Sequence, residues 1–217
     1  MDVMERNAGA CGDANSVSAP AAAQAGKGYL FCKRAFDIAV SFSVGAVLLI
    51  PLLFVAVAIR LDSPGPAIFR QWRMGRGGKP FAIFKFRTMR TDAPSEMPTN
   101  EFVNAEDYMT PLGAFLRKTS IDELPQLWNI LIGDMSFVGY RPVCLTEERL
   151  NQLRNDYGVF EARPGLTGYA QVQGRDNIDT DEKAMLDAEY VARRSFRLDM
   201  WCLWRTVKVV ITHEGAK

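Results

Sequence analysis

The chain has 217 residues, with 26 basic and 25 acidic side chains and a formal net charge of +1. This length suits one domain with a core plus an appendage, and the near-neutral charge argues against a protein built to coat nucleic acid. His213 is the only histidine, which argues strongly against a Ser-His-Asp triad and against a histidine-rich metal centre. The four cysteines form no close pair and no metal-type spacing, as in reduced cytosolic proteins, so any chemistry must come from carboxylates and cations.

The first part of the chain predicts a tail followed by a membrane segment. Residues 1–28 are rich in Ala, Gly, Ser and Asn without apolar periodicity, so we expect a disordered tail. Residues 29–61 are expected to form a membrane-embedded helix, because 35–59 is almost wholly apolar and would give ~37 Å of helix against a bilayer core of ~30 Å. The alternative is a buried core helix, but a soluble domain of this size has little use for so long an all-round apolar helix.

Two features of this helix favour re-entry over spanning. Pro51 lacks an N–H and should kink the helix past its middle. Basic residues flank both ends, with Lys33 and Arg34 before the apolar run and Arg60 after it, so the positive-inside rule favours neither end for export. Composition alone leaves a kinked spanning helix open.

Residues 62–217 are expected to form a small cytosolic catalytic domain. Its first element is a β-hairpin with strands over 67–72 and 80–89, joined by a glycine-rich turn. In the second strand Lys85 and Arg87 share one face, which is either a solvated face or a source of phosphate contacts. Eight basic residues and one acid between positions 60 and 90 favour an anionic partner near this stretch.

Helices account for most of the remaining domain. We expect a short helix at 111–118, a second containing Leu124 to Leu131 that ends at Gly133, and a third near 145–157. The region 181–211 is helix-rich, and its end mixes aromatic and basic side chains. That mixture suits either an amphipathic helix at a membrane interface or ordinary core packing with a cationic outer face.

The pair Asp122-Glu123 is the strongest candidate for chemistry. Ser120 and Glu123 match a capping box, and Pro125 belongs in a first turn, so the plain interpretation is a helix N-terminus. Nearby cations, among them Arg117 and Arg141, would make the same place an anion site. A carboxylate held there should stay ionised, and could attack phosphorus or hold Mg²⁺ or Mn²⁺.

Five longer motifs carry a specific resemblance. They are KRAFD at 33–37, FKFRTM at 84–89, LRKTSIDELPQLWNIL at 116–131, GDMSFVGYRP at 133–142 and RPGLTGYAQVQGR at 163–175. Together they resemble the monotopic phosphoglycosyl transferases, the bacterial sugar transferase family, in its short form. The resemblance implies a mixed α/β, mostly helical fold: a re-entrant membrane helix plus a small catalytic domain facing the cytosol at the bacterial inner membrane.

The resemblance also implies a ping-pong reaction between a UDP-sugar and polyprenyl phosphate. Asp122 would be the nucleophile and a Mg²⁺ ligand, and Glu123 its acid/base partner. The implied or candidate substrate-binding residues are Arg117, Arg141, Lys85, Arg87 and Arg175. The sequence departs from the family at two places: Ile50 stands before Pro51 where the family has serine, and Tyr140 stands where a proline is usual.

Two functions of other classes remain open beside the transferase. One is an inactive membrane-tethered scaffold or regulator, which the retention of Asp122, Glu123, Arg117 and Arg141 argues against. The other is a phosphohydrolase, for which a long membrane segment has no purpose. The sequence names neither the sugar, nor the glycan pathway, nor the oligomeric state.

Overall fold

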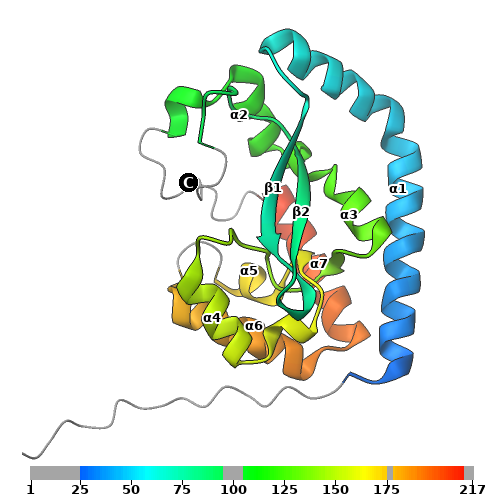
Figure 1. The fold of residues 1–217 in the computed structure, drawn as a ribbon. Coiled ribbons are helices and arrows are strands. Elements are labelled where there is room, and N and C mark those ends of the chain that lie inside the picture. The colour runs from blue at the N-terminus through cyan, green and yellow to red at the C-terminus, as the bar shows by residue number, and fades with distance from the viewer. Residues whose placement is uncertain (1–24, 95–104, 175–177, 213–217) are drawn as a thin grey trace, which may run out of the picture.

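The computed structural model describes residues 25–94, 105–174 and 178–212. Its first element, α1 (Lys27–Asp62), is a single helix with Pro51 inside it. Figure 1 shows α1 running along one side of the molecule and then bending over its upper end. Proline removes a backbone donor and crowds the carbonyl four residues earlier, which accounts for a bend in this half of the helix. The helix begins two residues before the predicted segment 29–61 and ends one residue after it, and the rest of the predicted tail, 1–24, lies outside the described residues.

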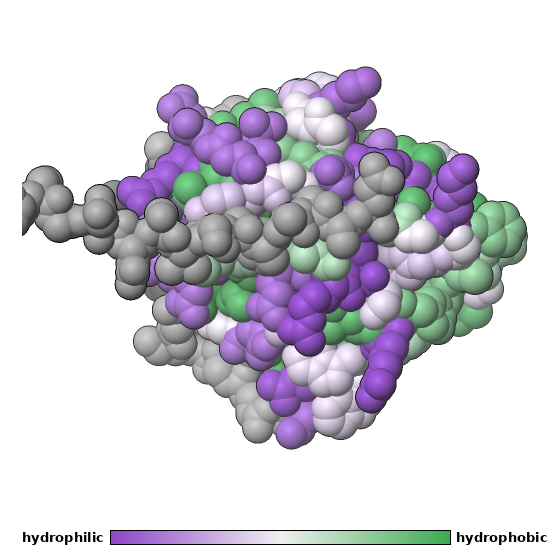
Figure 2. All heavy atoms as spheres, turned by 90° about the horizontal axis from the view of Figure 1, so that it is seen from below, coloured by the Kyte–Doolittle hydropathy of each residue, from purple (hydrophilic) through white to green (hydrophobic). Residues whose placement is uncertain are grey.

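α1 is long and apolar enough to cross a membrane, judged by length and composition. Most of its large apolar side chains do not pack on the domain, and Val47, Phe54 and Leu61 are each more than 70% exposed. Figure 2 shows hydrophobic spheres gathered on the right-hand side of the molecule, the side on which Figure 1 places α1. A helix that keeps this much apolar surface outside the protein core suits a membrane association.

The predicted hairpin is present. β1 (Ile68–Met74) and β2 (Pro80–Phe86) pair antiparallel, with Ile68 opposite Phe86 and Met74 opposite Pro80. The turn between them contains a short 3₁₀ segment, η1 (Arg76–Gly78), in which Gly77 and Gly78 both have positive φ. Glycine takes this conformation without steric strain, so the glycine-rich sequence sets the turn.

The helices that follow the hairpin carry the DELP segment. After the 3₁₀ turn η3 (Ala105–Tyr108) comes α2 (Pro111–Lys118), capped by the hydroxyl of Thr110. A second 3₁₀ turn, η4 (Ile121–Glu123), leads into α3 (Gln126–Ile132), which ends at Gly133 with φ 102° as the sequence predicted. α2 and α3 are therefore two separate helices, and the Asp-Glu pair lies in the turn between them.

A short parallel strand pair, which the sequence did not predict, joins the two halves of the domain. β3 (Ser136–Val138) pairs with β4 (Gly165–Thr167), and an isolated bridge extends the pairing from Tyr140 to Pro164. The backbones approach closely enough that a Cβ on Gly139 would lie 2.2 Å from the carbonyl oxygen of Arg163. Only glycine fits at this crossing.

The remaining elements surround this strand pair (Figure 1). They are α4 (Glu148–Asp156), η5 (Val159–Glu161), α5 (Tyr169–Gln173), α6 (Thr180–Arg193) and α7 (Phe196–Thr212). The largest hydrophobic cluster lies among β3, η5, α6 and α7, with Val138, Val159 and Val191 fully buried. On α7, Cys202 is buried in this cluster while Trp204 and Val207 are more than half exposed. One face of α7 therefore packs on the core as one interpretation predicted, and contact of its outer face with a membrane stays a prediction.

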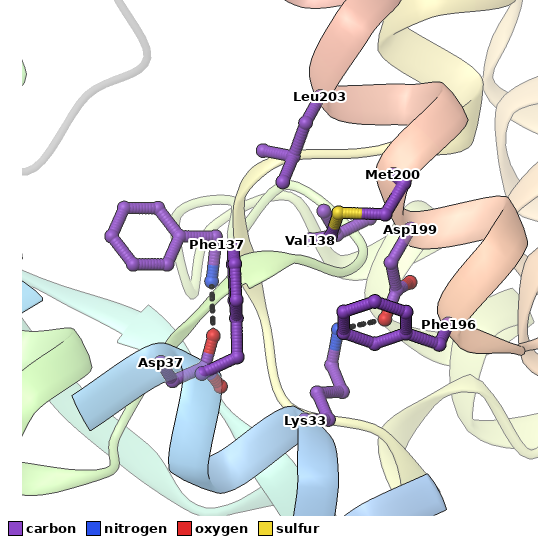
Figure 3. Close-up of a pocket in the computed structure, with 9 residues that line it drawn as sticks. Lys33, Asp37, Phe137, Val138, Phe196, Asp199, Met200 and Leu203 are labelled. Carbon is purple, nitrogen blue, oxygen red and sulfur yellow. Dashed lines mark hydrogen bonds and ion pairs between the residues drawn. The ribbon is translucent and has the colours of Figure 1, made fainter. Parts of the chain in front are cut away.

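Buried polar contacts fasten the first half of α1 to the catalytic domain. Lys33 donates to the Asp199 carboxylate of α7 at 2.7 Å, and the Asp37 carboxylate accepts from the Phe137 N–H of β3 at 3.1 Å (Figure 3). Asp37 also accepts from the Ser136 hydroxyl at 3.1 Å. Figure 3 shows the two acidic side chains on either side of a small pocket between α1, β3 and α7. The KRAFD motif thus serves to dock the helix on the domain.

Candidate active site

A cavity of about 1510 Å³ lies beside the hairpin and is lined by β1, β2, η4, α5 and α7, together with the segments after β2 and β3. Its lining is strongly basic, because nine cationic residues face only two acids, Asp122 and Glu123. The cationic lining residues are Arg70, Arg73, Lys85, Arg87, Arg90, Arg117, Arg141, Lys183 and Arg205. A hollow of this size with one sign of charge on its wall will concentrate anionic ligands.

A strained turn presents the two acids to this cavity. Ser120 has φ 57° and is the one non-glycine residue with positive φ in the described ranges. Strain of this kind persists only where surrounding contacts enforce it, and it gathers at functional sites. The Ser120 side chain makes no capping hydrogen bond; instead its carbonyl accepts from the Glu123 N–H at 3.2 Å. The predicted capping box is therefore wrong, because the Glu123 side chain is engaged elsewhere.

Glu123 is held between two cations. Its Oε1 accepts from Lys85 Nζ at 2.7 Å and from Arg141 Nη2 at 2.8 Å. Burial alone would raise the pKa of Glu123, but the charges and hydrogen bonds of Arg141 and Lys85 outweigh it and hold that pKa well below its usual range. Glu123 is thus an ion-paired carboxylate that links β2 to the segment after β3.

Asp122 has a different environment although it is the next residue. It is 7% exposed, and within the described ranges its carboxylate makes no hydrogen bond or ion pair. Burial raises the pKa of Asp122 above its usual value and the charge of Glu123 adds to this, while the charges of Lys85, Arg117 and Arg141 act in the opposite direction without outweighing burial. Asp122 lies in η4, ahead of α3, and the ionised state expected for a carboxylate at a helix N-terminus stays a prediction.

Arg117 is a further cation whose charge acts on Asp122. It comes from the last turn of α2, and its Nε donates to the Thr88 hydroxyl at 2.9 Å. Burial lowers the pKa of Arg117, and the charge of Asp122 opposes this. Thr88, which the sequence analysis did not single out, orients this guanidinium; its place in the FKFRTM motif was the available signal.

The predicted substrate contact at Arg87 is corrected by its hydrogen bonds. Arg87 follows β2, is buried, and donates to the carbonyls of Ser63 and Pro64 at 2.7 Å each and to the Ser63 hydroxyl at 3.0 Å. These are the groups at the C-terminal end of α1, which a cation stabilises. The guanidinium therefore anchors α1, while Lys85 pairs with Glu123, and a contact of Lys85 with the substrate stays a prediction. Arg175, a further predicted substrate contact, lies outside the described residues.

The carboxylates present suit a Mg²⁺ ion shared with a substrate better than a metal held by protein alone. In the described part of the chain no group of three or more His, Cys, Asp or Glu side chains could hold a metal. Glu123 is occupied by two cations, which leaves Asp122 as the donor. Mg²⁺ in phosphate-processing sites commonly takes one or two carboxylates plus the phosphates of the substrate and water, so Asp122 fits as its single protein ligand.

The chain is similar to a known family of proteins over most of its length. The family model described as bacterial sugar transferase matches residues 28–213. A UDP-glucose:undecaprenyl-phosphate glucose-1-phosphate transferase of Caulobacter vibrioides is 43% identical over 184 residues, covering 82% of this chain and 67% of the relative. A protein of the same name from Escherichia coli is 39% identical, covering 82% of this chain and 38% of the relative.

The relatives differ in length. An uncharacterized sugar transferase of Bacillus subtilis, EpsL, is 38% identical, and the match covers 86% of this chain and 90% of the relative. The chain therefore spans nearly the whole of some relatives and less than half of others, where it corresponds to one part of a longer protein. The match to the family model includes α1, the hairpin, the Asp-Glu turn and the strand pair. The chain thus belongs to the bacterial sugar transferase family and is a transferase enzyme.

Proposed function

We propose that this protein transfers a sugar 1-phosphate from a UDP-sugar to polyprenyl (undecaprenyl) phosphate, through a covalent phosphosugar intermediate on Asp122. The observation that carries the proposal is the contrast between the two acids: Glu123 binds two cations, whereas Asp122 is buried, without a partner in the described ranges, and bordered by Lys85, Arg117 and Arg141. A carboxylate without a partner beside cations can approach an anionic phosphate, which an ion-paired one cannot readily do.

In the first step a carboxylate oxygen of Asp122 attacks the β-phosphorus of the UDP-sugar. The bond from that phosphorus to the oxygen bridging the two phosphates breaks, and the electron pair leaves with UMP. The sugar phosphate stays on Asp122 as an acyl phosphate. Lys85, Arg117 and Arg141 offset the negative charge that otherwise opposes attack by an anion on a diphosphate.

In the second step a phosphate oxygen of the lipid acceptor attacks the same phosphorus. The bond between phosphorus and the Asp122 oxygen breaks, which restores the carboxylate and yields polyprenyl diphosphate sugar. The nucleophiles and leaving groups of both steps are carboxylates or phosphates. The second pKa of a phosphate group lies near ~6, so these groups can react and leave in their ionised forms. Neither step therefore needs a proton carrier.

This chemistry suggests a positioning role for Glu123. The resemblance implied an acid/base partner, but a carboxylate bound to Lys85 and Arg141 at 2.7 and 2.8 Å has no proton to give near neutral pH. We propose that Glu123 holds the two cations toward the cavity so that they meet the phosphates of the substrate. A Mg²⁺ ion bound by Asp122 would add neutralisation of the diphosphate charge.

The proposed setting is the cytosolic face of the bacterial inner membrane. Both ends of α1 contact the same catalytic domain, through Lys33 and Asp37 near its start and through Arg87 at its end. A helix tied at both ends to one domain should enter and leave the bilayer on one side, in a re-entrant arrangement. The cavity would then lie where a soluble nucleotide sugar and a lipid phosphate can both reach it.

The relatives' names support the reaction class but differ in the sugar: glucose for the Caulobacter vibrioides and Escherichia coli proteins, and galactose for one of Salmonella typhimurium.

Asp122→Asn tests the proposal in a UMP-release assay with purified protein in detergent or nanodiscs. We expect loss of turnover to background, because an amide cannot form the acyl phosphate, while the wild type releases UMP in excess of enzyme only when polyprenyl phosphate is present. Continuous UMP release without acceptor would indicate the phosphohydrolase, and no release with any of a panel of UDP-sugars would indicate the inactive scaffold. Wild-type turnover in Asp122→Asn would refute the nucleophile.

A further inference from the structure

Arg154 of α4 has no exposed side-chain surface, yet it is the largest of the fully buried residues in the described ranges. Its Nε and Nη2 donate to one carboxylate oxygen of Asp187 on α6, at 2.9 and 2.6 Å. Its third nitrogen, Nη1, donates to the backbone carbonyl of Arg141 at 2.9 Å. The guanidinium therefore ties two helices to the residue whose side chain faces the cavity.

The backbone on the N-terminal side of Arg141 is already fixed. The Gly139 N–H donates to the Thr167 carbonyl at 2.9 Å, and the Tyr140 carbonyl accepts from the Gly165 N–H at 2.8 Å. These bonds continue the β3–β4 pairing up to Tyr140. The next carbonyl, that of Arg141, accepts a hydrogen bond from Arg154 of α4. The backbone is therefore held for one residue beyond the end of the strand pair.

Tyr140 closes this arrangement from the other side. Its ring centroid is 5.1 Å from the Arg154 guanidinium, and the ring is fully buried. The aromatic face attracts the cation and so helps to hold the guanidinium in place. Tyrosine here, in place of the usual proline of the family, thus contributes a contact to Arg154.

Stability alone does not explain a guanidinium at this depth. Desolvating an ion pair offsets much of its attraction, and a well-packed apolar pair often stabilises a protein equally. The same two helices also carry a solvent-exposed pair, Arg149 with Asp181 at 2.6 Å, whose side chains are 72% and 51% exposed. The buried pair instead fixes the orientation of the guanidinium. Because the planar group of arginine is rigid, it can bind Asp187 and the Arg141 carbonyl at the same time.

We propose that Arg154, oriented by Asp187, is a positioning residue that fixes the Arg141 backbone so that the Arg141 side chain meets both Glu123 and the phosphate of the donor. The inference rests on the proposed function, since it assumes that Arg141 acts on that phosphate. Arg154 itself has no surface in the cavity and does not touch substrate.

A double-mutant cycle on kcat/KM tests the inference. Arg154→Met with Asp187→Leu removes both charges together, which avoids an unpaired buried ion and should preserve the fold. We expect this change to reduce kcat/KM about 10²-fold, since a misplacement of about 1 Å in an active site has an effect of that order. In an Arg141→Ala background the same change should reduce kcat/KM by less than about 3-fold, because the group it positions is already absent.

The control is Arg149→Gln with Asp181→Asn, which breaks the exposed pair between α4 and α6 and should leave activity and thermal unfolding unchanged. Equal reductions in both backgrounds would show a purely structural role and overturn the inference. If Arg141→Ala alone keeps wild-type activity, the role of Arg141 in the proposed function fails, and the inference with it. If the variant with Arg154→Met and Asp187→Leu does not fold, Asp187→Asn replaces it in the same cycle. A smaller reduction in the Arg141→Ala background would again support the inference, and equal reductions would overturn it.

Discussion

Replacing Glu123 by glutamine separates a positioning carboxylate from a proton carrier. The change keeps the size of the side chain and one acceptor oxygen, but removes the charge that faces Lys85 at 2.7 Å and Arg141 at 2.8 Å. The two cations then repel each other without a counter-ion, and we expect them to move apart by on the order of 1 Å. Such a displacement in an active site lowers turnover by about 10²-fold.

The pH dependence gives the decisive readout. Because the Glu123 pKa lies well below its usual range in the folded protein, the side chain is ionised throughout the working range of the enzyme. Glu123→Gln should therefore lower kcat/KM for UMP release by the same factor from about pH 6 to pH 9. A limb of the wild-type profile that disappears in the variant would mean that Glu123 titrates during catalysis, and would refute the positioning role.

The free energy of unfolding should also depend on the charge of Glu123. Removing one partner of a fully buried pair destabilises by ~3–5 kcal/mol. The Glu123 and Lys85 side chains retain 19% and 21% exposure, so we expect a smaller loss, of about 2 kcal/mol at pH 7. A carboxylate with a lowered folded pKa stabilises fully above its unfolded pKa of ~4.3, and this stabilisation is lost as the pH falls toward the folded value. The difference between wild type and variant in thermal unfolding should thus be constant above about pH 5.5 and shrink below about pH 4.

Glu161→Gln, at a carboxylate that is 51% exposed and outside the cavity lining, is the matched control and should change neither activity nor its pH profile.

Two other expectations concern the metal and the membrane. Excess EDTA should abolish UMP release and added Mg²⁺ or Mn²⁺ restore it, since Asp122 is a hard oxygen donor and the described residues that line the cavity include no histidine or cysteine; full activity in the chelator would show that the cavity cations suffice. Single cysteines at Gly26 and Lys79, in a background without native cysteines, should both be protected from an impermeant maleimide on intact cells. Reaction of the residue-26 cysteine from outside, with residue 79 protected, would mean a spanning helix. Lys79 is exposed and follows the turn, whereas Gly78 has φ 68° and would be strained as cysteine.

The features that the sequence predicted well are those governed by neighbouring residues. Two glycines with positive φ fix the hairpin turn, and Gly133 ends α3, because each needs only its own backbone conformation. The apolar run before Arg60 marks α1 by composition. Local chemistry was enough for these elements and for placing Asp122 and Glu123 in one turn.

The errors arose where distant residues decide the outcome. Glu123 fits a capping box locally, but its carboxylate pairs instead with Lys85, 38 positions away in sequence. Arg87 shares a strand pattern with Lys85, yet it binds carbonyls at the end of α1. The β3–β4 pair consists of two three-residue strands whose partners lie nearly 30 positions apart. No periodicity can reveal such short parallel strands.

The docking of α1 bears on how the helix can lie in a membrane. Its 36 residues would extend ~54 Å if straight, well beyond a bilayer core of ~30 Å. Asp37 is 1% exposed, and its carboxylate accepts hydrogen bonds from Ser136 and Phe137 of β3. Drawing this part of the helix into lipid away from the domain would strip those donors from a carboxylate, at a cost of several kcal/mol. In the proposed re-entrant arrangement the catalytic domain therefore lies at the same membrane depth as Asp37, and it also lies near the other end of α1, because Arg87 ties Ser63 to the same domain. A bend at Pro51 would fit both contacts, because it would let the apolar residues between them enter the bilayer and return on the same side.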